Sequence, residues 1–222
     1  MTSTPPTPPP ALVRSRTTVY ADFTCASCYL ASIRADRLIE RGHPAPDWRA
    51  VEHRPRLPLA GIRLHGSAQA IRGRELAATR LFLQPGERFE ARNPRFLPNT
   101  RAAIAAYAEA YEVGIAKQAR RLLFNAYWVQ GADIGDPEVL RKLLAAEIVS
   151  TAAHLRVRDW EQGWLALGPP VDLMVVNRYA TECGPSALHA LTEAGVQLHD
   201  HRCPPPSQGP GRRRVLETVP LG

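Results

Sequence analysis

Short apolar runs alternate with stretches of helical periodicity in the first quarter of the chain. The run T-T-V-Y-A-D-F at residues 17–23 is rich in β-forming residues and predicts a buried strand. Residues 28–41 have apolar positions at helical spacing, and Gly42 and Pro44 end that stretch. Residues 47–53 alternate between polar and apolar and predict a second strand. The crossover rule makes these two strands parallel neighbours.

The middle of the chain has helical periodicity almost throughout, after a proline-punctuated loop at residues 54–66. Trp160 and Trp164 stand four residues apart on one helix face, and we expect them and Trp128 to be core residues. Helices are predicted at residues 67–83, 100–111, 115–129, 138–146 and 154–167. A solvated helix face is predicted for Glu109, Glu112 and Arg120.

Strand signals return near the end of the chain. Residues 171–176 predict a strand, a hairpin leads to residues 179–181, and Gly184-Pro185 opens a last helix at 186–194. The order is β-α-β, a helical block, then β-β-α, which predicts an α/β fold with a large all-α insertion. The expected division is a sheet-containing domain (16–66 and 168–198), a helical insertion (67–167) and disordered proline-rich tails (1–15 and 199–222).

Composition restricts the class of protein further. The 222 residues are 45% hydrophobic, which is enough to build a core and excludes a wholly disordered chain. No apolar run approaches the roughly 20 residues of a membrane helix, so we expect no membrane span. The net charge of +7 comes almost entirely from dispersed arginines, so nucleic-acid binding is not expected. The N-terminal segment does not resemble a signal peptide, and a cytoplasmic location is expected.

Candidate chemistry lies at the first strand-to-helix junction, where Cys25 and Cys28 form a C-x-x-C motif. A cysteine at a helix N-terminus faces unpaired N–H groups and the positive end of the helix dipole, which favour the thiolate. Thiolate is the attacking species in thiol–disulfide exchange. Cys28 lies one helical turn further on, so Cys25 is the expected nucleophile and Cys28 the resolving thiol. A pair of cysteines that never oxidise is the simpler alternative.

Other cysteine and histidine residues could have metal or redox roles. Cys203, His199 and His201 could complete a zinc site with the motif, but they lie in the tail, so no metal is expected. Cys183 could pair with Cys203, although an unpaired thiol is favoured in a reducing compartment. His53 ends the second predicted strand and could face the site, but a structural histidine is favoured.

Three segments resemble one known family. The run D-F-T-C-A-S-C-Y-L-A (22–31) is similar to the active-site opening of DsbA-family thioredoxin-fold oxidoreductases, in the FrnE and 2-hydroxychromene-2-carboxylate isomerase-like branch. The insertion-domain signature of that branch is similar to two runs of this chain, L-P-N-T (97–100) and L-F-N-A-Y-W-V-Q-G-A-D-I-G-D-P-E-V-L (123–140). Residues 184–188 resemble the opening of its last helix. The resemblance implies a thioredoxin-like fold interrupted by an all-α domain, from about residue 17 to 195.

The resemblance also assigns roles to single residues. It implies that Cys25 is the nucleophile and Cys28 the resolving cysteine, and it implies substrate-binding positions at Tyr29, Asn99 and Thr100. Two features depart from the family. Ala26 and Ser27 replace the common proline and aromatic or histidine residue, which leaves the redox direction open. The family has a cis-proline opposite the cysteines that takes part in substrate binding, and Pro170 is the nearest candidate for it. Counting back from the predicted strand, however, puts Asp172 at that position.

The sequence therefore predicts a thiol–disulfide oxidoreductase that acts on a thiol or disulfide of a protein or small molecule. No metal or organic cofactor is required, and glutathione is a candidate co-substrate. Homodimer formation is implied by the family alone. Two alternatives remain: a glutathione-dependent isomerase or transferase on the same fold, for which Cys28 is dispensable, and a binding module that has lost redox function.

Overall fold

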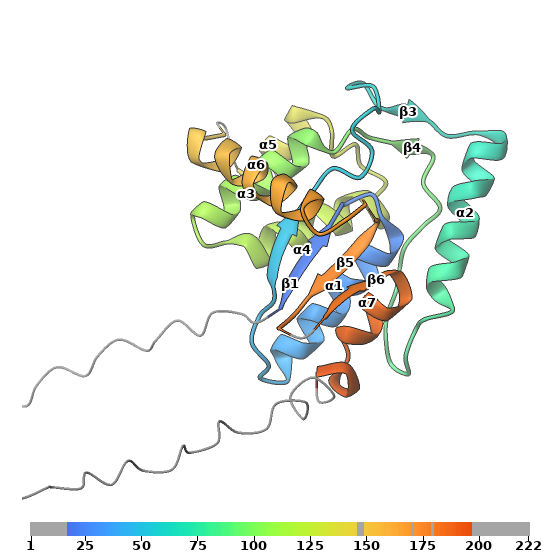
Figure 1. Cartoon of the computed structure of the whole chain (residues 1–222). Helices are drawn as coiled ribbons and strands as arrows, with labels where there is room; N and C mark the ends of the chain where they lie inside the picture. Colours follow the sequence, from blue (N-terminus) through green and yellow to red (C-terminus); the bar gives the residue numbers. More distant parts are fainter. Residues whose placement is uncertain (1–16, 146–148, 170, 179, 197–222) are drawn as a thin grey trace, which may run out of the picture.

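The core of the molecule is a four-stranded mixed sheet. A computed structural model describes residues 17–145, 149–169, 171–178 and 180–196. The strands are β1 (Thr18–Ala21), β2 (Asp47–Ala50), β5 (Leu173–Val176) and β6 (Thr181–Cys183), in the order β2-β1-β5-β6. β1 is parallel to β2, as the crossover rule predicted, and antiparallel to β5, while β6 completes the predicted hairpin with β5. Figure 1 shows this sheet at the centre of the fold.

Two helices from the ends of the folded chain pack together against the sheet. α1 (Ala26–Glu40) follows β1, and α7 (Gly184–Ala190) follows β6 with Pro185 in its first turn. α7 contacts α1, β5 and β6, and Figure 1 shows the two helices side by side. The last helix ends at Ala190 rather than at residue 194. The N-terminal end of α1 thus lies at the edge where β1 ends.

The middle of the chain contains the five predicted helices. They are α2 (Gly66–Arg80), α3 (Arg101–Glu112), α4 (Ala116–Trp128), α5 (Pro137–Leu144) and α6 (Thr151–Leu165). α3 packs on α4, α5 and α6, whereas α2 contacts α1 and stands across the sheet from that group in Figure 1. No helix among the described residues combines the length and apolar character needed to cross a membrane.

The expectation of an irregular loop at 54–66 and a purely helical middle was wrong at two places. β3 (Ile62–Arg63) pairs antiparallel with β4 (Phe96–Leu97) as a separate two-stranded sheet. Gly61 precedes this ribbon with φ +65°, and a Cβ there would lie 2.5 Å from Phe96 Cζ. Each strand has two residues and its partner is distant in sequence, so no local periodicity reveals it.

One hydrophobic core runs from the sheet into the helices. Phe23, just after β1, makes edge contacts with Tyr107 of α3 and Phe124 of α4, with ring centroids 5.6 and 5.1 Å apart. Trp128 Nε1 donates a hydrogen bond to the Phe23 carbonyl at 3.0 Å. The three tryptophans predicted as core are buried. The helices therefore hold the segment that leads directly to Cys25.

The predicted solvated face is wrong for Arg120. This arginine is 3% exposed, and its guanidinium forms an ion pair with Asp36 of α1 and lies 4.8 Å from the Trp48 ring centroid. Glu109 accepts the Ser150 N–H at 2.8 Å, and Glu112 pairs with Arg156 of α6 at 2.6 Å. Glu109 is half-buried and Glu112 is exposed, so the predicted solvated face fails only at Arg120. Asp36 of α1 and Trp48 of β2 lie against Arg120, and the periodicity of α4 alone could not show that.

Candidate active site

Cys25 is the N-cap residue of α1. Its backbone is extended, and its Sγ accepts the N–H of Cys28 at 3.2 Å. A cap side chain normally supplies an oxygen to the unpaired N–H groups of the first turn, and here sulfur takes that role. Because N–H groups and the helix dipole favour a negative charge at this position, the cap geometry favours the thiolate of Cys25.

Asp22 fixes the turn between β1 and α1. Its Oδ1 accepts hydrogen bonds from the N–H and hydroxyl of Thr24, both at 2.8 Å. Its Oδ2 accepts the His53 N–H at 2.9 Å and the Thr100 hydroxyl at 3.0 Å. This carboxylate is 1% exposed. It therefore ties the segment after β2 and the start of α3 to the cysteine turn.

His53 faces the two cysteines, which the sequence allowed but did not favour. The register pairs Ala21 with Ala50, so the segments after β1 and β2 leave the sheet at the same edge. Its side chain is 2% exposed and stacks on Trp164, with ring centroids 5.4 Å apart. A ring nitrogen of His53 and the two sulfurs of Cys25 and Cys28 all lie within 4.8 Å of one another. The parallel pairing of the two strands was the available signal.

Asp172 lies beside the cysteines, just before β5. β5 pairs with β1 with Leu173 opposite Ala21, so the residue before β5 lies beside the cysteine turn. The Cys28 thiol donates to the Asp172 carbonyl at 3.1 Å, and Asp172 Oδ1 lies 3.6 Å from His53 Nδ1. Asp172 thus occupies the position that counting back from the strand gave. Pro170 lies outside the described residues, and no peptide bond among the described residues is cis.

The two cysteines ionise very differently. Burial opposes ionisation of Cys25, but Cys28 and the imidazole of His53 stabilise the thiolate more strongly and lower its pKa from 9.0 to about 6. Burial, together with the neighbouring Cys25 thiolate, raises the pKa of Cys28 well above its ordinary value. Burial opposes the charged form of His53, but Cys25, Asp22 and Asp172 outweigh it and raise its pKa. The site therefore separates one ionised sulfur from one protonated sulfur.

Comparison with known proteins identifies the family. The model of the DSBA-like thioredoxin domain matches residues 17–159, nearly two thirds of the chain. The chain belongs to this DsbA-like family. The resemblance inferred from residues 22–31 is thereby confirmed. No curated protein sequence is significantly similar to the chain.

Solved structures show the same DsbA-like fold at low sequence identity. A probable DsbA oxidoreductase from Streptomyces coelicolor is 17% identical with a TM-score of 0.64, over 85% of this chain and 91% of that one. The cytosolic disulfide reductase DsbM from Pseudomonas aeruginosa, determined with GSH, is 12% identical with a TM-score of 0.57, over 84% and 98%. A 2-hydroxychromene-2-carboxylate isomerase is 18% identical with a TM-score of 0.53, over 84% and 97%. These likenesses establish the thioredoxin-like fold of the DsbA-like chain.

The three substrate-binding candidates within the described residues, one on α1 and two just before α3, are all engaged with protein groups. Tyr29 of the DsbA-like chain is half-buried and stacks on Phe124 and Trp128, with ring centroids 5.6 and 6.3 Å apart. Asn99 donates to the Leu57 carbonyl at 3.0 Å and accepts the Arg101 N–H at 3.0 Å. Thr100 donates to Asp22. Their contacts among the described residues hold the turn of the site, and a role in binding substrate stays a prediction.

A pocket of about 220 Å³ opens beside Cys25 in the DsbA-like site. It lies between the first turn of α1, the side of α2 and the start of α7, and Ser27, Arg72, Asp172 and Pro185 are among its lining residues. Arg72 donates to the Thr24 carbonyl and lies 5.8 Å from the Trp128 ring centroid, and its Nε has no hydrogen-bond partner among the described residues. Cys25 is only 3% exposed, and its remaining exposure is at the wall of this pocket.

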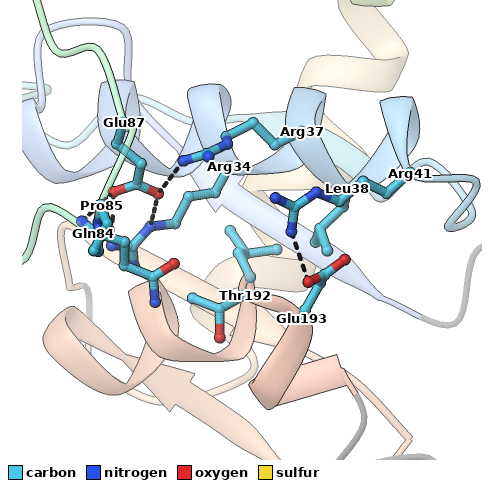
Figure 2. A pocket seen from close by; sticks show the side chains of 10 residues that line it. Arg34, Arg37, Leu38, Arg41, Gln84, Pro85, Glu87, Thr192 and Glu193 are labelled. Atoms are coloured by element: carbon cyan, nitrogen blue, oxygen red, sulfur yellow. Dashed lines mark hydrogen bonds and ion pairs between the residues drawn. The ribbon is translucent and has the colours of Figure 1, made fainter.

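A second pocket of about 220 Å³ lies at the C-terminal half of α1 (Figure 2), and Cys25 is not among its lining residues. Its arginines are already paired. Arg34 binds Glu87 at 2.8 Å, with both side chains under 5% exposed, and Arg41 binds Glu193 at 2.6 Å. Arg34 also donates to the Leu188 carbonyl at 2.6 Å. This network joins α1 to α7 and to the segment after α2, so it braces the helix that carries the cysteines.

Proposed function

We propose that this DsbA-like protein catalyses thiol–disulfide exchange, with Cys25 as the attacking sulfur and Cys28 as the resolving sulfur. The observation that carries the proposal is the asymmetry of the pair. The pKa of Cys25 is lowered to about 6 and its sulfur borders the pocket, whereas Cys28 is fully buried and its pKa is raised. A nucleophile needs the thiolate and access, and a resolving thiol needs only proximity to the first sulfur.

The reaction balances with two electrons and two thiols. The Cys25 thiolate attacks a substrate disulfide, forms a mixed disulfide and releases one substrate thiolate, which takes a proton. Cys28 then gives its proton to solvent, its thiolate lies beside His53, and it attacks Cys25 Sγ; the departing thiolate takes a proton from solvent in turn. The second substrate thiolate leaves, the substrate is reduced, and the Cys25–Cys28 disulfide forms. Two equivalents of a thiol such as glutathione restore the dithiol, and the reverse sequence oxidises a dithiol substrate.

The pKa of Cys25 bears on the redox direction. Stabilising the thiolate stabilises the reduced form, so a lower pKa makes the disulfide a stronger oxidant. The value of about 6 lies between those of thioredoxin and DsbA, at about 7 and about 3.5. We therefore expect a midpoint potential between about −270 and −120 mV, the values of those two proteins. The cytoplasm and glutathione belong to the proposal because a fold neighbour is named a cytosolic disulfide reductase with GSH.

A redox titration in glutathione buffers tests the proposal, with cysteine pairing mapped by mass spectrometry. A reversible Cys25–Cys28 disulfide with one midpoint supports dithiol exchange. Cys25→Ser should abolish reduction of a model disulfide, and Cys28→Ser should trap a mixed disulfide on Cys25. Cys183→Ser is the matched control, because Cys183 is a free, exposed thiol on β6. Thiols that stay reduced across the whole titration would refute the proposal.

A glutathione-dependent isomerase or transferase is the second candidate. It is favoured by a fold neighbour that is a 2-hydroxychromene-2-carboxylate isomerase. In that chemistry Cys25 binds or activates glutathione and Cys28 is dispensable. Isomerase activity that survives Cys28→Ala would establish this candidate over dithiol exchange. Redox-inactive binding remains if neither reaction occurs, and homodimer formation stays a prediction that analytical ultracentrifugation tests.

A further inference from the structure

The ring nitrogens of His53 have hydrogen-bonding capacity that no contact among the described residues satisfies. Its ring is almost completely buried, yet neither Nδ1 nor Nε2 has a hydrogen-bond partner among the described residues. A buried polar atom without a hydrogen bond is costly, because it has lost its hydration. A charge effect on Cys25 requires only that the ring is near. The unpaired nitrogens therefore point to a ligand that the site is built to accept.

The ring faces two sulfurs at distances that suit a shared ligand. A nitrogen of His53 and the Sγ atoms of Cys25 and Cys28 all lie within 4.8 Å of one another. Donor atoms around a tetrahedral zinc ion, with bonds of about 2.0–2.3 Å, are separated by roughly 3.4–3.8 Å. Side-chain rotations that move the donor atoms by about 1 Å would bring them to the separations of a zinc site. The carboxylate of Asp172 lies beside the ring and is 64% exposed, so it can turn toward the same centre.

We propose that the reduced protein binds one Zn²⁺ ion through Cys25, Cys28 and His53, with Asp172 next to the fourth coordination position. Two thiolates and an imidazole are donors that favour zinc over the oxygen-seeking ions Mg²⁺ and Ca²⁺. Two thiolate charges balance the ion, which makes a buried site neutral. Binding displaces the Cys28 proton, and also the proton of His53 where that ring is charged, into solvent.

The site is redox-dependent because both sulfurs are shared. A Cys25–Cys28 disulfide removes both thiolate donors, so zinc binding and disulfide formation exclude each other. Bound zinc holds the cysteines reduced and blocks attack on a substrate. The inference requires reduced cysteines but does not depend on exchange activity, so the two proposals can fail separately.

The test uses the full chain, reduced and freed of metal and reductant, titrated with Zn²⁺ against a chromophoric chelator. We expect one ion per chain in the reduced protein and none after oxidation of the pair. Co²⁺ as a substitute should give thiolate charge-transfer bands and the visible bands of a tetrahedral site. Absence of a stoichiometric site in the reduced wild-type chain would overturn the proposal.

Variants identify the ligands. His53→Ala should weaken zinc binding by at least about 100-fold, because loss of groups that merely support a ligand already costs about 10- to 100-fold. His65→Ala is the matched control, since His65 is exposed and its side chain makes no cap hydrogen bond. Cys203→Ser should leave affinity unchanged. Unchanged affinity in His53→Ala, or loss in Cys203→Ser alone, would contradict the assigned ligand set.

A spectroscopic measurement keeps the inference testable if His53→Ala does not fold. X-ray absorption of the zinc-loaded wild-type chain should show two sulfurs at about 2.3 Å and lighter ligands at about 2.0–2.1 Å. A sulfur-only shell would overturn the proposal. Exchange by the metal-free protein without zinc binding refutes this inference alone. Zinc binding by a protein that never exchanges thiols refutes the proposed function alone.

Discussion

Replacing His53 with alanine tests the electrostatic basis of the candidate site. His53 supplies two of the interactions that lower the pKa of Cys25 to about 6, and Cys28 supplies another. An opposite charge in contact typically moves a pKa by about 1 to 3. The variant should therefore raise the pKa of Cys25 to between about 7 and 9. At about 1.4 kcal/mol for each pKa unit, the imidazole contributes roughly 1.4–4 kcal/mol to the thiolate.

The rate of alkylation at one pH is a poor measure of this change. A rise of about 2 in the pKa lowers the thiolate fraction near pH 7 about tenfold. The more basic thiolate is also more nucleophilic, by about six- to tenfold for a Brønsted coefficient of 0.4–0.5. The two effects nearly cancel. The midpoint of the full pH–rate profile is the quantity that separates the variant from the wild type.

The assay is iodoacetamide labelling of the reduced protein from acid to alkaline pH, with Cys25 followed by mass spectrometry of its peptide. The wild-type midpoint should lie near 6 and the His53→Ala midpoint at least about 1 higher, with a faster alkaline plateau. The Cys183 peptide is the internal control, because that thiol is exposed and outside the site. His65→Ala should retain the wild-type profile. A midpoint that stays near 6 without His53 would refute the reasoning.

Three further substitutions test the framework of the fold by urea denaturation. Arg120→Ala should lower the free energy of unfolding by about 3 kcal/mol, because it breaks a buried ion pair with Asp36. Arg121→Ala should cost less than about 1 kcal/mol, because the Arg121 side chain is 45% exposed. Equal losses of stability in the two variants would contradict the argument from burial. Thr100→Val removes one donor to the buried Asp22 carboxylate and should cost about 1.5–3 kcal/mol, and no change would show that this bond adds nothing. Gly61→Ala places a Cβ against Phe96 and should speed hydrogen exchange at the Leu64 amide, which donates a hydrogen bond to the Arg95 carbonyl. Gly42→Ala is the control, because nothing lies near that position, and it should leave the Leu64 amide protected.

Local signals predicted most of the secondary structure. The β-rich run before Cys25, the periodic stretch after it and the stop at Gly42 produced β1 and α1 within a few residues. Pro185 marked a helix start because proline suits the first turn, where its missing N–H costs nothing. These features depend on neighbours in sequence. β3 and β4 were missed because each has only two residues and a partner far along the chain.

The burial of a side chain was predictable only where the sequence pattern of its own helix or strand indicated it. The tryptophans were correctly placed in the core because Trp160 and Trp164 share one face of α6 and indole rings carry a large apolar surface. Arg120 was misplaced because its burial depends on a carboxylate 84 residues earlier, on α1. No property of α4 alone indicates that partner.

The sequence by itself determined the order of elements and the place of the cysteine pair at a helix N-terminus, because capping and helical spacing act over three or four residues. Only the tertiary structure decided what surrounds that pair. The parallel register of β1 and β2 brings His53 to the sulfurs, and the antiparallel register of β1 and β5 brings Asp172. Strand pairing joins residues that are distant along the chain, and burial sets how strongly their charges act. The character of the Cys25 thiolate is therefore a property of the assembled sheet edge.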